Sequence, residues 1–238
     1  MTPEPIVAAL GWGSLIWRPE ALPLRRPWFP DGPVTRIEFL RQSPGGRLTL
    51  VVDPAGSPVR TLWALLEVEG VERAREHLRR REGIPEDRPE WVGSWSVGDP
   101  APGRIPALPA WAAARSLDGV VWTGLPPKFN EEEGSVPSLE EALGYLKERR
   151  GAEWNSAREY VQRAPLQVNT RYRRAFEEEL GWIPADLPQL PARGLLASGG
   201  PIRAVDSTSP GPPPPASTAR PRGGGGADPE ADLQNGNS

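Results

Sequence analysis

The sequence contains no cysteine and a single histidine, and these absences exclude much of enzyme chemistry. Without cysteine the chain has no disulfides, no thiolate zinc ligands and no thiol nucleophile. A Ser-His-Asp triad would depend entirely on His77, and a zinc site with several histidine ligands cannot form. We therefore expect catalysis to rest on carboxylates, hydroxyls and backbone amides, with no metal and no cofactor.

Long hydrophobic runs and an excess of positive charge are missing as well. No stretch reaches the ~18 apolar residues that a membrane-spanning helix needs, and the N-terminus lacks the basic start and long apolar core of a signal peptide. The formal net charge of −3 offers no electrostatic footprint for nucleic acid or an anionic membrane. These features favour a cytoplasmic protein that binds neither.

Composition divides the chain into two parts. Residues 195–238 contain no aromatic residue and are rich in proline and glycine. Such a segment cannot bury enough apolar surface to offset the entropy lost on folding, so we expect a disordered tail. A proline-rich docking peptide is the alternative. Residues 1–194 are expected to form one domain.

Within that domain, strand-like segments mostly precede helical ones. We expect strands near 5–11, 34–43, 47–53, 60–68, 90–98 and 119–125. The third and fourth flank the turn DPAGSP and are predicted to pair as a hairpin. Helices are expected at 71–82, 138–150, 153–164 and 170–181, the second opening with a Ser138–Glu141 capping box. This order predicts an α+β fold around a mixed or barrel-like sheet with flanking helices.

Residues 11–17 read GWGSLIW and follow the first expected strand. Gly11 and Gly13 permit backbone angles closed to other residues and let a ligand approach the main chain. A strand ending in Gly-X-Gly-Ser can present amides to a carboxylate or an oxyanion, and Ser14 adds a hydroxyl. The alternative is a plain glycine turn with core tryptophans. A dinucleotide fingerprint is excluded, because the third glycine and the following helix are missing.

Glu82 continues the apolar stripe of the helix expected at 71–82. Val71, Ala74 and Leu78 are spaced three and four residues apart, and Glu82 takes the next place on the same face. A carboxylate there, at the end of a buried stripe, suits a general base. The alternative is a surface glutamate at a frayed helix end, paired with a neighbouring arginine.

Three other polar residues have a structural explanation as well as a functional one. Arg41, late in an expected strand, is a candidate for binding a carboxylate or for an exposed salt bridge. Asn169 and Tyr172 lie at the start of a helix, where asparagine is a common cap and either residue could contact a ligand.

The segment NEEEGS at 130–135 is expected to be a solvated loop, with a mobile lid or a weak metal patch as alternatives.

These motifs, in this order, resemble those of the γ-glutamylcyclotransferase superfamily, and of its ChaC-like branch in particular. GWGSLIW resembles the family's Y-G-S-L-I-W signature, and GRLTLVVDPAG its G-R-x-x-T-L-x-x-D-P-x-G segment. LRRREG is similar to L-x-x-R-E-x-G, and VNTRY to R-N-x-E-Y. The resemblance extends over residues 6–182.

The resemblance implies an enzyme that cleaves a γ-glutamyl amide by intramolecular cyclisation to 5-oxoproline. Its partner would be a small-molecule γ-glutamyl substrate: glutathione, a γ-glutamyl peptide or a γ-glutamylamine. Glu82 would be the general acid and base. The predicted substrate-binding residues are Gly11, Trp12, Gly13, Ser14, Leu15, Arg41, Asn169 and Tyr172.

The sequence departs from the family pattern at three positions. Trp12 replaces the signature tyrosine, and Val168 and Arg171 replace the arginine and glutamate of R-N-x-E-Y. These changes favour a bacterial branch with its own substrate over a glutathione-specific enzyme. From another functional class, the alternative is a non-catalytic small-molecule binding module on the same fold.

Overall fold

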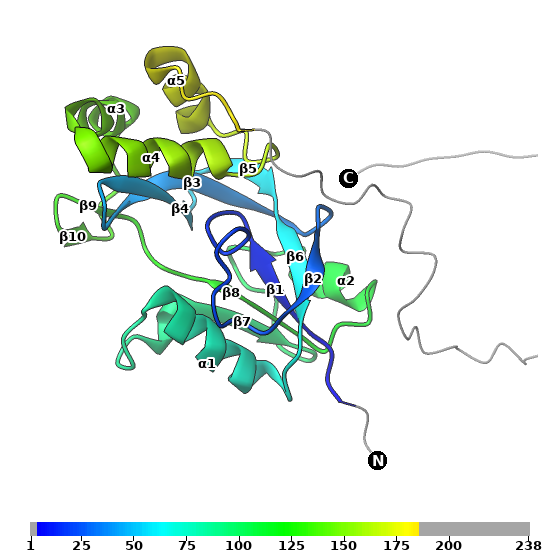
Figure 1. Cartoon of the computed structure of the whole chain (residues 1–238). Helices are drawn as coiled ribbons and strands as arrows, with labels where there is room; N and C mark the ends of the chain where they lie inside the picture. Colours follow the sequence, from blue (N-terminus) through cyan, green and yellow to red (C-terminus); the bar gives the residue numbers. More distant parts are fainter. Residues whose placement is uncertain (1–3, 186–238) are drawn as a thin grey trace, which may run out of the picture. The chain divides into compact units, whose positions relative to one another are not determined.

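A computed structural model describes residues 4–185 of the chain (Figure 1). The predicted domain boundary at residue 195 and the predicted disordered tail lie outside the described residues. Helices and mixed sheets share the described part, so the predicted α+β class is confirmed. Among the helices of residues 4–185, none is both long and apolar enough to cross a membrane.

The first sheet surrounds a completely buried central strand. Its strands are β1 (Val7–Gly11), β2 (Leu24–Phe29), β6 (Leu62–Leu66), β7 (Val92–Ser96) and β8 (Gly119–Thr123), in the order β2-β6-β1-β8-β7. β1 runs antiparallel to β6 and parallel to β8, and all five of its residues are buried. Burial on both faces explains why this strand is apolar throughout and does not alternate.

The second sheet is organised along one long strand. It contains β3 (Val34–Ser43), β4 (Arg47–Val52), β5 (Ser57–Arg60), β9 (Lys128–Phe129) and β10 (Glu132–Glu133). β3 pairs with β4 over its later residues and with β5 over its first four. It also pairs with β9, in parallel, at one position.

The predicted hairpin of 47–53 with 60–68 is wrong, because β4 and β6 belong to different sheets. After β4 the chain turns at Asp53–Gly56, returns along the start of β3 as β5, and then enters the first sheet as β6. A Cβ at Gly56 would lie 2.6 Å from the backbone nitrogen of Ile37. Glycine thus lets the turn close against β3, whose ten residues accommodate both partners.

Helices cover each sheet separately (Figure 1). α1 (Val71–Glu82) packs on β1, β7 and β8 of the first sheet. α4 (Gly151–Arg163) packs on β4, α5 (Arg171–Leu180) on β3, and α3 (Leu139–Glu148) on both β4 and α5. The predicted capping box of α3 is confirmed, since Ser138 and Glu141 exchange side chain–backbone hydrogen bonds of 2.8 and 3.2 Å. α2 (Leu108–Ala113) and the 3-10 turn Pro89–Trp91 complete the set.

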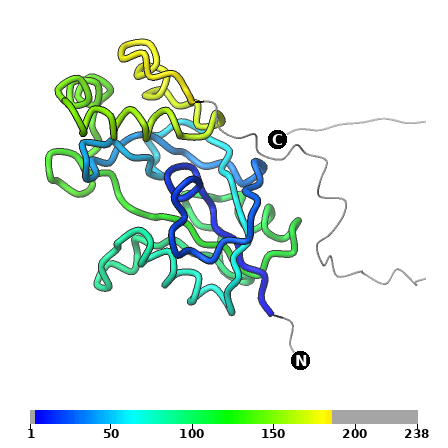
Figure 2. The backbone as a smooth tube through the Cα atoms, in the orientation of Figure 1, coloured from blue at the N-terminus to red at the C-terminus, as the bar shows by residue number. Residues whose placement is uncertain are grey.

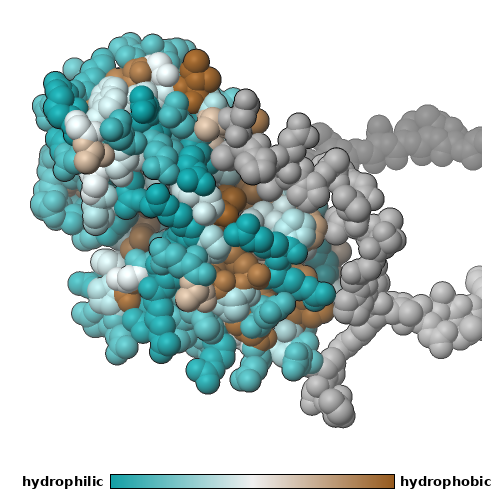
Figure 3. All heavy atoms as spheres, viewed as in Figure 1, coloured by the Kyte–Doolittle hydropathy of each residue, from teal (hydrophilic) through white to brown (hydrophobic). Residues whose placement is uncertain are grey.

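The buried side chains form two clusters. One lies between β3, β4 and the helices α3 to α5, and extends to the first sheet; the other lies between the first sheet and α1. In Figure 3 hydrophilic side chains dominate over the helices, while hydrophobic ones show between the two layers. The loop that follows β1 lies between these layers (Figure 2), and it carries the GWGSLIW segment.

Candidate active site

The loop between β1 and β2, two strands of the first sheet, reaches across to the second sheet. Gly11 ends β1 in the first sheet, and residues 12–18 turn back toward α4 and β4. The indole Nε1 of Trp12 donates to the Leu50 carbonyl of β4 at 3.3 Å, and the Trp12 side chain is only 4% exposed. Trp12 is thus a core residue that fixes the loop against the second sheet.

Part of this loop satisfies its own backbone groups and part does not. Ile16 N–H donates to the Gly13 carbonyl at 3.0 Å, and Arg18 N–H to the Ser14 carbonyl at 2.7 Å. Within residues 4–185 the amides of Gly13, Ser14 and Leu15 donate no hydrogen bond to protein. Because buried amides normally find a partner, three consecutive free donors form a suitable cradle for an anionic group.

The two glycines are required by close packing and not by unusual backbone angles. A Cβ at Gly11 would lie 2.7 Å from the Trp28 ring, and one at Gly13 would lie 2.5 Å from the Tyr160 hydroxyl. Neither glycine has a positive φ. The backbone freedom that glycine permits is therefore not used as a positive φ at either position, and Tyr160 is the group that approaches the main chain at Gly13.

Glu82 ends α1 on its buried side. Ala74 and Leu78 are completely buried, and the Glu82 side chain, next on that stripe, is 15% exposed. Its Oε1 accepts from the Thr123 hydroxyl at 2.9 Å and from Arg81 Nη1 at 2.7 Å. The predicted stripe is confirmed, and the carboxylate is held by one hydroxyl and one cation.

Arg81 joins Glu82 to the loop. The same guanidinium that contacts Glu82 donates through Nη2 to the Ser14 hydroxyl at 3.2 Å and to the Arg18 carbonyl at 2.6 Å. Its side chain is only 7% exposed. Two motifs separated by 67 residues in the sequence therefore meet in one polar cluster.

Tyr160 of α4 completes the cluster and was not singled out from the sequence. Its side chain is 6% exposed, and its hydroxyl accepts from the Leu50 N–H at 3.2 Å. The edge of the Trp17 ring packs on it with 5.6 Å between centroids. Burial, together with the negative charge of Glu82, raises the pKa of Tyr160 to about 12, so this phenol stays protonated at neutral pH. Tyr160 can be assigned to this cluster only from its contact with Gly13 in the folded structure.

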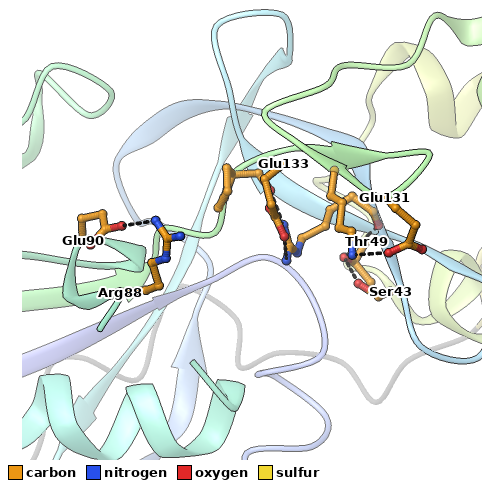
Figure 4. Close-up of polar contacts among 9 residues, drawn as sticks. Ser43, Thr49, Arg88, Glu90, Glu131 and Glu133 are labelled. Carbon is orange, nitrogen blue, oxygen red and sulfur yellow. Dashed lines mark hydrogen bonds and ion pairs between the residues drawn. The ribbon is translucent and has the colours of Figure 1, made fainter. Parts of the chain in front are cut away.

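Arg41 is engaged in an ion pair at the edge of this region. Its guanidinium contacts both carboxylate oxygens of Glu133, at 2.5 and 3.0 Å, and donates to the Pro126 carbonyl at 2.9 Å. It also lies 5.6 Å from the centroid of the Trp91 ring. Figure 4 shows Glu133 in its ion pair and, apart from it, Glu131 of the same β9–β10 segment, which pairs with Lys128. The segment expected as a solvated loop thus supplies the partner of Arg41.

Asn169 and Tyr172 make their contacts elsewhere. Asn169 Oδ1 accepts from Arg174 at 3.2 Å, and the Tyr172 hydroxyl donates to the Pro137 carbonyl at 2.7 Å. Among the hydrogen bonds of the described residues, none joins either side chain to Glu82. Their assignment to the substrate site remains a prediction from the sequence.

A second buried carboxylate, Glu38, lies beside these two residues. It is 1% exposed and accepts hydrogen bonds from the Phe39 and Tyr172 amides and from the Thr170 and Ser57 hydroxyls. Desolvation raises its pKa, although these four donors oppose the shift. Glu38 connects β3 and β5 to the start of α5, and its four hydrogen-bond partners all lie outside the Glu82 cluster.

The fold and the cluster together define an α+β protein with a half-buried carboxylate beside a loop of free amides. Among residues 4–185, no three carboxylate or histidine side chains converge as a metal site requires. Comparisons of the chain with protein-family models, with curated proteins and with solved structures give no match. Any assignment of function therefore depends on the residues of this cluster.

Proposed function

We propose that the protein is a γ-glutamylcyclotransferase-like enzyme that releases 5-oxoproline from a γ-glutamyl amide, and that its fold is of that family. The observation that carries the proposal is the bridge from Glu82 through Arg81 to Ser14. The two stretches that resemble the family's binding loop and its catalytic segment lie far apart in the chain. Their meeting in one cluster is what such a reaction needs.

The reaction requires a base near the substrate's α-amine. Glu82 takes a proton from the α-ammonium, and the freed amine attacks the γ-carbonyl carbon to close a five-membered ring. The bond from that carbon to the leaving nitrogen then breaks as Glu82 passes the proton to this nitrogen, and the second proton of the attacking nitrogen follows by the same route, so that the amine leaves as an ammonium and Glu82 is again ionised. The products are 5-oxoproline and a free amine or peptide, so that the atoms balance without metal, redox step or water.

The loop supplies the complementary anion site. The free amides of Gly13, Ser14 and Leu15 bind the α-carboxylate or the oxygen that becomes negative during attack. Because nucleophile and carbonyl belong to one molecule, the main task of the site is to hold the substrate folded. Holding two separate reactants together can lower a barrier by about 7–11 kcal/mol, and the gain is smaller here because the reacting groups are already joined.

Incubation with a panel of glutathione, γ-glutamyl dipeptides and γ-glutamylamines tests the proposal, with 5-oxoproline followed by mass spectrometry. Glu82→Gln should abolish release while preserving the fold, because the amide keeps the size of the side chain. Glu72→Gln is the matched control, since Glu72 lies on the same helix and its side chain is 92% exposed.

The binding-module alternative predicts a different result in the same experiment. The wild-type protein would then bind a γ-glutamyl compound by calorimetry without releasing 5-oxoproline, and Glu82→Gln would leave that binding largely intact. Release from any member of the panel that vanishes in Glu82→Gln and persists in Glu72→Gln excludes this alternative.

A further inference from the structure

We propose that Tyr160 is a second catalytic residue, whose hydroxyl donates a hydrogen bond to the γ-carbonyl oxygen of the substrate as that oxygen becomes negative. The inference rests on the proposed function and deepens it. It is carried by the position of the hydroxyl, by its free proton and by the way it is anchored.

The hydroxyl lies directly against the loop. It occupies the space where a Cβ of residue 13 would stand, at 2.5 Å from that point. It therefore adjoins the stretch whose Gly13, Ser14 and Leu15 amides are free. An anion bound by these amides would have the Tyr160 hydroxyl as a neighbour, and donors that converge on one oxygen are the arrangement that stabilises an oxyanion.

The proton of this hydroxyl has no acceptor in the described part of the chain. The oxygen is already an acceptor for the Leu50 N–H at 3.2 Å, and no hydrogen bond of residues 4–185 has it as the donor. A buried tyrosine hydroxyl usually finds a partner. By contrast, the Tyr172 hydroxyl donates to a carbonyl at 2.7 Å. The free proton of Tyr160 is thus available to a ligand.

The fold holds the hydroxyl in place from several sides. The register of β3 and β4 shifts between Phe39 and Arg41, next to the pairing of Phe39 with Leu50, and the Leu50 amide points to Tyr160 instead. Such irregularities are frequent beside active sites. The Trp17 ring and the Arg47 guanidinium, 5.6 and 5.9 Å from the tyrosine ring, fix it further. A donor fixed before the reaction needs no reorganisation during it.

Electrostatics agree with this role. Burial and the charge of Glu82 both raise the pKa of the Tyr160 phenol, so the hydroxyl keeps its proton at neutral pH. When the amine attacks, the electron pair of the carbonyl moves to oxygen, and Tyr160 shares its proton with that oxygen by hydrogen bonding. When the leaving nitrogen departs, the pair returns and the hydroxyl is unchanged.

Steady-state kinetics of 5-oxoproline release test the inference, with Tyr160→Phe compared against Tyr145→Phe. Tyr145 of α3 is a half-buried tyrosine whose ring packs on Phe129 and Arg149, outside the cluster. Loss of one oxyanion donor should lower kcat about 10²-fold with KM little changed, and Tyr145→Phe should behave like the wild type. Unaltered kcat in Tyr160→Phe, or a higher KM alone, overturns the inference and leaves the proposed function standing. Absence of release from the wild-type protein overturns the proposed function, and this inference with it.

Tyr160→Phe also removes the acceptor of the Leu50 amide, so a second variant keeps the test independent of folding. Site-specific replacement of Tyr160 by 3-fluorotyrosine retains the hydroxyl but makes it more acidic. The alkaline limb of the kcat–pH profile should then move to lower pH than in the wild type, because an ionised phenol cannot donate. An unmoved profile contradicts the assignment, whatever the stability of the phenylalanine variant.

Discussion

The Arg81 guanidinium lies 3.2 Å from the Ser14 hydroxyl and so joins the end of α1 to the loop after β1. The same group neutralises Glu82 at 2.7 Å. In this arrangement Arg81 acts through its neighbours: it positions the carboxylate and the loop relative to each other without being a proton donor or acceptor in the reaction.

Replacing Arg81 by methionine should therefore impair both stability and turnover. A charged hydrogen bond of this kind contributes about 1.5–3 kcal/mol to the free energy of unfolding, and a small displacement of the base should lower kcat by about 10²-fold. Chemical denaturation and kcat measure the two effects. Arg81→Lys keeps the charge but lacks the fork of donors that contacts Glu82, Ser14 and the Arg18 carbonyl together, so its stability and kcat should lie between those of the wild type and Arg81→Met.

Arg80→Met is the matched control for this prediction. Arg80 is the preceding residue on the same helix, is 72% exposed and pairs with Glu76 at the surface. Exposed pairs contribute about 0.2–1 kcal/mol, so its kcat should equal that of the wild type. Equal kcat values for Arg81→Met and Arg80→Met would refute a positioning role.

Gly13→Ala should destabilise the protein through one identified clash. Its Cβ would meet the Tyr160 hydroxyl at 2.5 Å, whereas the next tyrosine atom is 3.5 Å away, an ordinary contact. Overpacking of this kind costs about 1–3 kcal/mol. The cost should largely disappear when Gly13→Ala is made in the Tyr160→Phe background, which a double-mutant cycle of unfolding free energies detects.

Gly144→Ala gives the opposite expectation and serves as the control. Gly144 lies in α3, where a Cβ would meet nothing within 4 Å. Alanine in an exposed helix interior is favoured by about 0.5–1 kcal/mol over glycine.

For the double-mutant cycle at Gly13, a Gly13→Ala penalty that is the same in the wild type and in Tyr160→Phe would show that Tyr160 does not press on the loop.

Much of the architecture could be predicted from the sequence, and the reasons are local. The strand at 34–43 and the helix at 71–82 were predicted with the bounds that the structure has, because alternation and an apolar stripe mark them. The pairing of β4 was predicted wrongly, because its choice of partner depends on β5 and on the close approach of Gly56 to β3. β2 and α2 also escaped prediction.

The candidate site divides in the same way. Glu82 and the glycine loop could be recognised because each carries a local pattern. Tyr160 and Thr123 could not, because a helical tyrosine and a strand threonine look ordinary until the fold places one beside Gly13 and the other 2.9 Å from Glu82. Trp12, by contrast, was predicted to bind substrate, but its side chain lies in the core and its indole Nε1 donates to the Leu50 carbonyl.

Glu38 should make stability depend on pH. Burial raises its pKa above the ordinary value of about 4.3, so the folded state holds this proton more tightly than the unfolded state. Protonated Glu38 therefore adds to the free energy of unfolding. This contribution is fully present below the pKa that Glu38 has in the unfolded state, and it is lost as the pH rises through the pKa that it has in the folded state. Because glutamine does not titrate, the free energy of unfolding of Glu38→Gln should not show this decrease with pH.

Urea unfolding of both proteins at a series of pH values checks the sign. The free energy of unfolding of Glu38→Gln minus that of the wild type should increase with pH above about 4.3 and then level off. Taking the difference removes the contribution of the other carboxylates. A difference that does not vary with pH would mean that Glu38 titrates alike in the folded and unfolded states.

The most direct test of the central claim is release of 5-oxoproline from a panel of γ-glutamyl substrates by the wild-type protein and by Glu82→Gln. We expect the wild type to release 5-oxoproline from at least one substrate and the folded variant to release none. Release that continues unchanged in Glu82→Gln would contradict the assignment of the base, and no release from any substrate by the wild type would contradict the proposed function.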